Sequence, residues 1–364
     1  MRKLTSDDIM SITPYAPGKP VEELERELGI TGSIKLASNE NPVGPSPKAL
    51  AAIPAVLSSL HRYPDGNAFC LKDAIAAKFG VRTDEIILGN GSNELLEIVV
   101  RTFLLEGEEA IYAEPSFAVY RLAAQACGRK SIAVPLKDGR HDLSGMADHI
   151  TEKTKIIFIA NPNNPTGTIN SGVELAELVA RTPKNTIIVM DEAYYEYVTD
   201  PAYADSMKYF MDGRNIIILR TFSKIYGLAG LRIGYGFAPA HLVDLMNRVR
   251  APFNTNSVGQ AAAVAALSDD EHVLKAIAVN EEGKKYLYPE LDSLGINYVP
   301  TQANFIYMDL GHDTREVYNA LLKQGVIIRP MGPTQIRVTI GLPAENTRFI
   351  DALSTVVKGW RSSN

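Results

Sequence analysis

The sequence has few of the residues that build disulfide frameworks or metal clusters. It contains two cysteines, Cys70 and Cys127, which are too few for a disulfide framework, and their separation matches no zinc or redox motif. The six histidines are scattered, without the close spacing that metal ligands on one helix need. We therefore expect no metal site and no disulfide-stabilised fold.

Long apolar runs and an excess of basic residues are also missing. No apolar run approaches membrane-spanning length, and the opening stretch MRKLTSDDIM lacks the apolar core of a signal peptide. The net charge of −5 disfavours nucleic acid and anionic membranes as partners. No serine lies in a G-x-S-x-G elbow, which disfavours a hydrolase of that type. These absences predict a soluble, cytoplasmic protein.

What the chain does have is a series of short apolar runs separated by helix-like segments. Continuous runs of this kind are typical of strands buried on both faces of a parallel sheet. The intervening segments have helical patterns, such as residues 92–104 with Ser92 as a plausible N-cap. Alternating strands and helices predict an α/β fold. The runs are at residues 85–89, 109–113, 131–135, 155–160, 186–190 and 215–219.

The pattern changes from about residue 240. Two helical stretches are followed by short strands and further helices, which predicts a smaller α+β domain. A chain of 364 residues is long for one compact core. We predict an N-terminal arm at 1–34, a large α/β domain at 35–250 and a small C-terminal α+β domain at 251–364.

Polar, glycine-rich or aromatic residues follow five of the six runs. In parallel sheets, ligands bind beyond the carboxyl ends of the strands. The convergence of these segments predicts a cofactor or substrate site along that edge of the sheet. The segments are GNGSNE, EPSF, NPNNPTG, DEAYYEY and RTFSK.

The segment GNGSNE offers an anion site at a predicted helix start. Ser92 and Asn93 would present free backbone N–H groups at the positive end of the helix dipole. Arg232 offers a charge-assisted fork for the same anion, and Thr221 and Ser223 offer hydroxyls. The alternative is an ordinary strand-to-helix turn with a good cap. Together these residues are typical of a phosphate site.

The remaining strand-end residues are typical of a site for a flat, charged ligand. Lys224 lies in an apolar segment, where a charge is costly unless it is paired or neutralised. The alternative is that the segment is a surface turn and the lysine is solvated. Asp191 follows a buried strand and needs a cationic partner, either an Arg or Lys or a protonated pyridine nitrogen. Asn164 and Tyr194 could bond a phenolate-type oxygen, and Phe117 either lies on a ring or packs in the core. An amine nucleophile, an acid and a phosphate site define pyridoxal 5′-phosphate, bound as a Schiff base on Lys224. On this hypothesis both Lys224 and the phosphate-binding Arg232 are buried.

The chain resembles the fold-type I aminotransferases over nearly its whole length. The resemblance is carried by the motifs NPNNPTG, DEAY and SK…GLAGLRIGY, in this order and spacing. Within them it is similar to the histidinol-phosphate aminotransferases. The resemblance implies a large domain with a mostly parallel central sheet flanked by helices, and a smaller α+β domain. Further markers are PYAPGKP, LASNENPVGPSP, RYPDG, GNGSNELLE, ANFIYMDL, VIIRP and IRVTIG.

The implied activity is transamination. L-Histidinol phosphate and 2-oxoglutarate would be interconverted with imidazole-acetol phosphate and L-glutamate, in histidine biosynthesis, by a ping-pong Schiff-base mechanism with pyridoxal 5′-phosphate. The partners would be a small-molecule amino donor and a 2-oxo acid acceptor.

The resemblance also implies residue roles. Lys224 would form the Schiff base and move the proton, and Asp191 would keep the pyridine nitrogen protonated. Asn164 and Tyr194 would address the ring hydroxyl, and Phe117 would stack on the ring. The phosphate would be held by Ser92, Asn93, Thr221, Ser223 and Arg232.

Tyr63 is implied to reach the phosphate of a neighbouring subunit, which gives a homodimer with shared active sites. Arg337 would read the anionic end of the substrate. The resemblance also places residues around the substrate, namely Tyr15, Asn39, Phe253 and Arg329.

Three positions depart from the family pattern. Asn93 stands where members commonly carry Asp, with little consequence expected because its backbone N–H is unaffected. Phe253 stands where some members have a Tyr that could bond the substrate phosphate, and the stretch 331–335 is short. Both weaken the expectation of a strictly phosphorylated substrate.

Three alternative functions remain. One is an aromatic amino-acid aminotransferase with the same residues. A second is a pyridoxal-phosphate-dependent decarboxylase of a phosphorylated amino acid. A third is a transcription regulator with an aminotransferase-like sensor domain, which would need an attached DNA-binding domain; the arm is expected to be too short for one.

Overall fold

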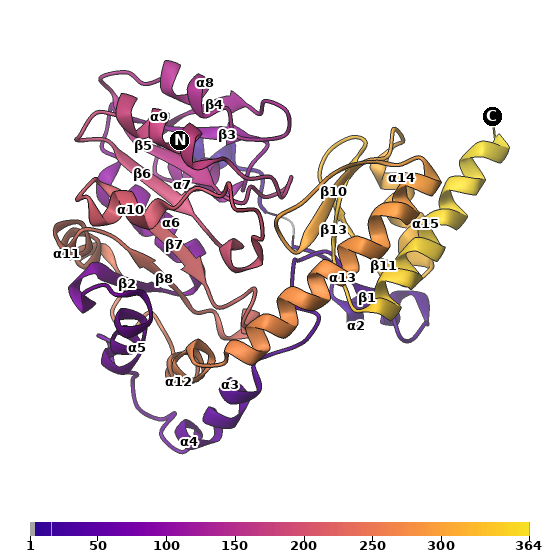
Figure 1. The fold of residues 1–364 in the computed structure, drawn as a ribbon, viewed down its shortest axis with the longest axis horizontal. Helices are drawn as coiled ribbons and strands as arrows, with labels where there is room; N and C mark the ends of the chain where they lie inside the picture. The colour runs from indigo at the N-terminus through magenta and orange to yellow at the C-terminus, as the bar shows by residue number, and fades with distance from the viewer. Residues whose placement is uncertain (1–3, 16, 364) are drawn as a thin grey trace.

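The computed structural model of the chain describes residues 4–15 and 17–363. Residues 1–3 and 16 of the predicted arm, and residue 364, lie outside the described residues. Figure 1 shows a larger body around one sheet and a smaller body around another, with helix α13, Asp270–Leu294, running from one to the other.

The larger body is built on a seven-stranded sheet in the order β2-β8-β7-β6-β5-β3-β4. Neighbouring strands are parallel except at β8, which is antiparallel to both β2 and β7. All six predicted apolar runs are strands of this sheet, so the mostly parallel sheet is confirmed. The strands are β2 Ile86–Gly89, β3 Glu109–Glu114, β4 Lys130–Pro135, β5 Thr154–Ala160, β6 Ile187–Asp191, β7 Ile216–Thr221 and β8 Gly234–Phe237.

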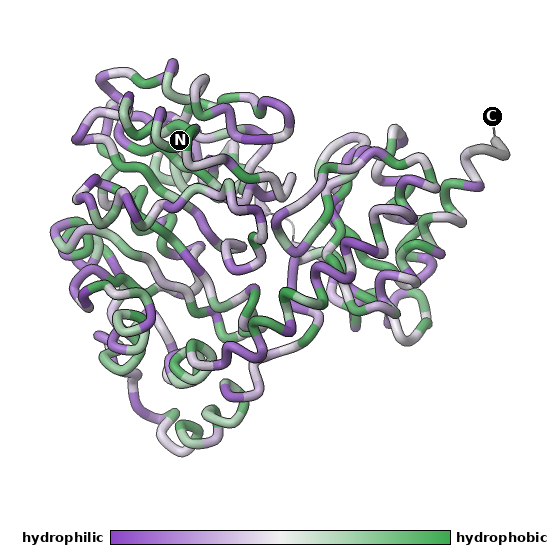
Figure 2. Tube along the Cα trace, viewed as in Figure 1, coloured by the Kyte–Doolittle hydropathy of each residue, from purple (hydrophilic) through white to green (hydrophobic). Residues whose placement is uncertain are grey.

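The central strands contain continuous apolar runs because both faces of the sheet are covered. On β5, Ile157 and Ile159 enter one hydrophobic core, whereas Ile156 and Phe158 enter the core on the opposite face. Each buried side chain of this size contributes about 1.5–3 kcal/mol of transfer free energy. Figure 2 shows hydrophobic stretches along these strands and alternating hydrophobic and hydrophilic residues along α13.

The helices around this sheet occupy the segments between the strands. Helix α6 was predicted with Ser92 as its N-cap, and that prediction is wrong: the N-cap is Asn90, and Ser92 lies in the first turn. The physical reason is that the Glu94 carboxylate accepts the Asn90 N–H at 2.6 Å. The helices are α3 Pro47–Ala52, α4 Pro54–Leu57, α5 Phe69–Phe79, α6 Gly91–Phe103, α7 Val119–Ala126, α8 Leu143–Asp148, α9 Gly172–Arg181, α10 Ser206–Met211, α11 Ala240–Val249 and α12 Ser257–Leu267, with single 3₁₀ turns η1 Thr83–Glu85, η2 Tyr195–Tyr197 and η3 Ala229–Leu231.

The smaller body contains a four-stranded antiparallel sheet in the order β12-β13-β10-β9, packed with long helices. The last helix begins at Pro343. The elements are β9 Asn297–Val299, β10 Phe305–Asp309, α14 Thr314–Lys323, β12 Arg329–Pro330, β13 Gln335–Thr339 and α15 Pro343–Ser363.

The N-terminal segment joins this smaller body. Strand β1, Ile34–Lys35, pairs in parallel with β11, Val326–Ile327. Leu24 of helix α2, Val21–Leu28, is buried with residues of the smaller body. Helix α1, Asp7–Met10, packs instead on α7 of the larger body.

Helix α12 packs against α3 and α5, and its buried alanines belong to a core of the larger body. Among residues 4–15 and 17–363, no helix is both long and apolar enough to cross a membrane.

Candidate active site

A pocket opens at the carboxyl edge of the large sheet and is closed from one side by the smaller body. It brings together almost all of the predicted site residues; Tyr63, Phe253 and Arg329 are not part of its lining. The pocket is lined by Tyr15, Gly18, Ala37, Ser38, Asn39, Ser92, Asn93, Phe117, Tyr120, Ala160, Pro162, Asn164, Asp191, Ala193, Tyr194, Thr221, Ser223, Lys224, Arg232 and Arg337.

One end of the pocket is an anion cup at the start of α6. The N–H groups of Gly91, Ser92 and Asn93 lie in the first turn, where a helix offers no internal acceptors. The Arg232 guanidinium lies across this turn, and its Nη1 donates to Ser223 Oγ at 3.3 Å. Gly91 has a φ of 74°, which favours glycine, and a Cβ atom there would also displace that guanidinium.

The burial predicted for Arg232 is wrong, because this residue is exposed. It lines the pocket, and its Nη2 donates to the backbone carbonyl of Asn90, the N-cap of α6, at 3.5 Å. Thr221 Oγ1, deeper in the pocket, accepts the Ser223 N–H at 3.1 Å. The cup therefore combines backbone donors, hydroxyls and one cation that water can reach.

Two non-glycine residues of the pocket have left-handed backbones, Asn39 at φ 54° and Arg232 at φ 52°. Such a conformation costs about 1–3 kcal/mol, less for asparagine than for most residues. Asn39 uses it to donate its backbone N–H to Thr339 Oγ1 at 2.9 Å and its side-chain amide to Tyr194 OH at 2.9 Å. The strained backbone conformation thus holds functional side chains in position in the pocket.

Lys224 is partly buried, and its Nζ donates to the backbone carbonyl of Ser38 at 3.1 Å. Burial, together with the nearby cations Arg337 and Arg232, lowers the pKa of Lys224 from 10.5 to about 7. The amine is therefore largely uncharged just above neutral pH, which is the form that acts as a nucleophile.

Asp191 ends strand β6 and is 6% exposed. Its Oδ2 accepts a hydrogen bond from Tyr120 OH at 2.8 Å, and its Oδ1 accepts the backbone N–H of Ala193 at 3.3 Å. Burial raises the pKa of Asp191 from 3.8 to about 6, against the opposing effect of these two donors. Tyr120 was not predicted, although its place three residues after Phe117 puts the two rings on one face of a helical turn.

A buried ion pair lies behind this carboxylate. Arg220 Nη2 on β7 is 2.8 Å from Glu192 Oε2, in the residue that follows β6. Both side chains are buried, and the Arg220 guanidinium also lies 3.6 Å from the centre of the Tyr195 ring. The pair ties the ends of β6 and β7 together, where Asp191 is in register with Leu219.

Arg337, on β13 of the smaller body, reaches across to the larger body. Its Nη1 donates to Asn164 Oδ1 at 2.6 Å and its Nη2 to the backbone carbonyl of Ala37 at 2.8 Å. The residue is 6% exposed, and its Nε has no hydrogen-bond partner among the described residues. A buried cation with two neutral partners and one unused donor is suited to an anion.

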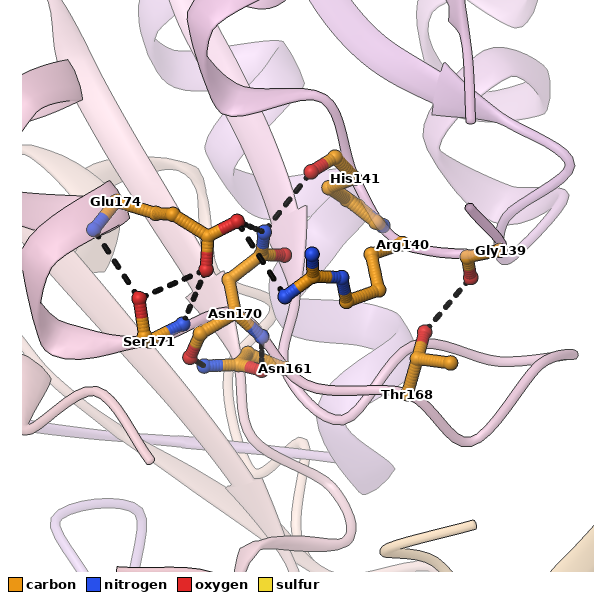
Figure 3. Close-up of polar contacts among 8 residues, drawn as sticks. All are labelled: Gly139, Arg140, His141, Asn161, Thr168, Asn170, Ser171 and Glu174. Atoms are coloured by element: carbon orange, nitrogen blue, oxygen red, sulfur yellow. Dashed lines mark hydrogen bonds and ion pairs between the residues drawn. The ribbon is translucent and has the colours of Figure 1, made fainter. Parts of the chain in front are cut away.

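The turn that carries Asn164 is held from behind by a polar network, drawn in Figure 3. Asn170 donates its backbone N–H to Asn161 Oδ1 at 2.9 Å and its side-chain amide to the backbone carbonyl of His141 at 2.9 Å. The Glu174 carboxylate accepts from the same amide at 3.4 Å. These bonds fix the turn and with it the position of Asn164.

The three predicted residues outside the pocket lie around it. Tyr63 is 82% exposed, and its ring stacks on Phe253, which is 46% exposed, with 4.8 Å between centroids. The Arg329 guanidinium lies 4.9 Å from the centre of the Tyr15 ring, and Tyr15 lines the pocket. Arg329 therefore contacts a residue of the pocket wall, whereas Tyr63 is exposed and does not line the pocket of its own chain.

The sequence profile of the family described as aminotransferase class I and II matches residues 31–353. The match spans far more than half of the chain, so the chain belongs to this family, and the predicted fold is confirmed.

The chain is similar to proteins of one activity within that family. It is 50% identical to the histidinol-phosphate aminotransferase of Moorella thermoacetica, over 96% of this chain and 92% of that protein. It is 48% identical to histidinol-phosphate aminotransferase 1 of Nitrosococcus oceani, over 99% and 98%. The crystal structure of histidinol-phosphate aminotransferase from Sinorhizobium meliloti, in complex with pyridoxal-5′-phosphate, matches with a TM-score of 0.90 at 27% identity, covering 99% of each chain.

The lowered pKa of Lys224 gives a first prediction. In the cofactor-free protein, acetylation of Lys224 by an amine-directed reagent should rise with a midpoint near pH 7, because the uncharged amine predominates above its pKa of about 7. Exposed lysines should become reactive only near the free-amine pKa of about 10.4. Peptide mass spectrometry across a pH series measures both. A midpoint for Lys224 above pH 9 would contradict the lowered pKa.

Proposed function

We propose that this protein is a pyridoxal 5′-phosphate-dependent aminotransferase of histidine biosynthesis. It interconverts L-histidinol phosphate and 2-oxoglutarate with imidazole-acetol phosphate and L-glutamate. The observation that carries the proposal is the meeting of the Lys224 amine, the Asp191 carboxylate and two arginines in one pocket. The names of relatives at 48–50% identity support the choice of substrate.

The residues present fit the cofactor. Among the described residues, the hydrogen-bond donors to Asp191 are neutral, so its negative charge is available to a cationic ring nitrogen. Tyr194 addresses the ring hydroxyl, and Phe117, on the pocket wall, offers an aromatic face to the ring. The phosphate is held by Ser92, Asn93, Thr221, Ser223 and Arg232.

When bound, the cofactor supplies an aldehyde that condenses with amines and a ring that withdraws electrons. Lys224 would provide the amine that holds this aldehyde and the base that moves the proton. Its pKa of about 7 allows it to give and accept a proton near neutral pH. Asp191 stabilises the protonated ring nitrogen and so strengthens electron withdrawal.

The contact with Arg337 sets the orientation of the Asn164 amide. Because Asn164 Oδ1 accepts from the guanidinium at 2.6 Å, the amide nitrogen is the end that remains to donate. That donor serves the hydroxyl oxygen of the cofactor ring. One contact thus links cofactor recognition to the arginine that binds substrate.

Arg337 must serve two kinds of anion. Histidinol phosphate has a phosphate and no carboxylate, whereas glutamate has two carboxylates. The planar guanidinium fork binds either group through paired hydrogen bonds, which a lysine point charge does not. Tyr15, Asn39, Phe253 and Arg329 complete the substrate surroundings.

The working unit is a homodimer with shared sites. Tyr63 is largely exposed and does not line the pocket of its own chain, which suits a role in the site of a second subunit. The enzyme is cytoplasmic. It is divided into an arm, a large cofactor-binding domain and a small domain. Because α12 packs on the larger body, the boundary between the large and the small domain is better placed beyond residue 250, within α13.

A second candidate function is an aromatic amino-acid aminotransferase. An apolar cavity continues from the pocket and shares Tyr15, Asn93 and Phe117 with it. Leu122 and Val119 of α7 are among its other walls. Such a space suits an uncharged ring as well as an imidazole.

Steady-state kinetics with 2-oxoglutarate as acceptor test the two candidates. We expect kcat/KM for histidinol phosphate to exceed the values for phenylalanine and tyrosine by about tenfold or more, because only the phosphate engages the cationic groups fully. Lys224→Ala provides the inactive control. A higher kcat/KM for either aromatic amino acid would favour the second candidate.

Arg337→Lys should impair both half-reactions, and Arg337→Ala should impair them more. Losing a buried charge-assisted pair costs about 2–5 kcal/mol in transition-state binding. Single-turnover measurements with glutamate and with histidinol phosphate separately are the test. The dual role fails if either half-reaction of Arg337→Ala runs within a few-fold of wild type.

Shared sites predict complementation between inactive chains. Tyr63→Phe and Lys224→Ala spoil different sites of a dimer, so a mixed dimer contains one site with both changes and one with neither. Activity should partly return after subunit exchange, monitored by native mass spectrometry. A mixture that exchanges and stays as inactive as its parents excludes the shared site.

A further inference from the structure

The hydroxyl of Tyr120 makes a contact to which the proposed mechanism gives no role. Tyr120 lies on α7, is 1% exposed, and donates to Asp191 Oδ2 at 2.8 Å. With the Ala193 N–H on Oδ1, it is one of two hydrogen bonds on a carboxylate that faces the pocket.

The Tyr120 ring is held on two sides. It stacks on Phe158 of β5 with 5.0 Å between centroids and 6° between planes. It also meets Phe117 edge to face, at 5.9 Å and 86°. Aromatic pairs of both kinds are favourable, so the ring has little freedom to turn the hydroxyl away.

The charge of the donor matters as much as its position. Of the ionisable groups that act on Asp191, Glu192 raises its pKa and Lys224 lowers it, and Tyr194 lies close by. A cationic side chain in place of Tyr120 would neutralise Asp191 and compete with a cationic ring. A neutral hydroxyl favours the ionised carboxylate and leaves its charge of −1 for the ligand.

We propose that Tyr120 is a positioning residue. It keeps Asp191 ionised, aims the carboxylate at the pocket and braces Phe117 at the same time. The proposal rests on the proposed function, because the ring nitrogen of the cofactor is what makes the charge of Asp191 useful.

The test measures Asp191 directly in cofactor-free protein. Carbon-13 labelled aspartate is titrated by NMR, with the Asp191 signal assigned from Asp191→Asn. In Tyr120→Phe the pKa of Asp191 should rise by about one pH unit, because the charged form loses a hydrogen bond. The matched control is Tyr197→Phe, which removes a buried tyrosine hydroxyl that is not among the described donors to Asp191; here the pKa should stay at its wild-type value.

A second readout uses the loaded enzyme. At pH 6, near the pKa of Asp191, Tyr120→Phe should lose about fivefold in the rate of the glutamate half-reaction, because a pKa about one unit higher leaves fewer Asp191 carboxylates ionised. Its dissociation constant for pyridoxal 5′-phosphate should change less than about threefold, because the anion cup is intact. If wild type itself neither binds the cofactor nor transaminates, the proposed function fails, and the NMR titration still decides the effect of Tyr120 on Asp191.

Two results overturn the proposal: an unchanged pKa in Tyr120→Phe, or an equal rise in Tyr197→Phe. Should Tyr120→Phe fail to fold, 3-fluorotyrosine at position 120 replaces it. This more acidic hydroxyl is a stronger donor, so the pKa of Asp191 should fall. A rise or no change with 3-fluorotyrosine also overturns the proposal.

Discussion

The hydrogen bond from Arg337 to Asn164, 2.6 Å long, joins the smaller body to the larger one inside the pocket. It places a cation over the edge of the large sheet and fixes which end of the Asn164 amide faces inward. Neighbouring contacts depend on the same approach of the two bodies. Asn39 bonds both Tyr194 of the larger body and Thr339 of the smaller one. Without this contact the pocket would lose one wall and the orientation of two ligand-binding groups.

The buried charges of the pocket are not balanced by the chain itself. Arg337 bonds neutral partners, Asp191 accepts from neutral donors, and Lys224 donates to a backbone carbonyl. Burying such groups is unfavourable, and the raised pKa of Asp191 and the lowered pKa of Lys224 are the measure of that cost. A ligand with an anionic end and a cationic ring removes the imbalance. The pocket is therefore built for its ligand at the expense of the stability of the free protein.

Much of this arrangement could be predicted from sequence, because strand ends of a parallel sheet meet at one edge. The apolar runs located six strands, and the residues after them located Asp191, Lys224 and Asn164. Strand β8 was missed because two of its four residues are glycine, which leaves no apolar run. The contact of Tyr120 with Asp191 and that of Arg337 with Asn164 could not be derived. Both depend on how separate layers pack, which residue spacing does not encode.

The left-handed backbone conformations of Asn39 and Arg232 place functional side chains in the pocket but lower the stability of the fold. Glycine would adopt either conformation without strain, so a selection for heat resistance alone rewards replacing both residues. The same replacements remove the amide that donates to Tyr194 and the guanidinium that contributes the cation of the anion cup. Thermostabilised variants of this chain must therefore gain their stability at other positions. A variant library selected only for folding will accumulate pockets that no longer bind a ligand.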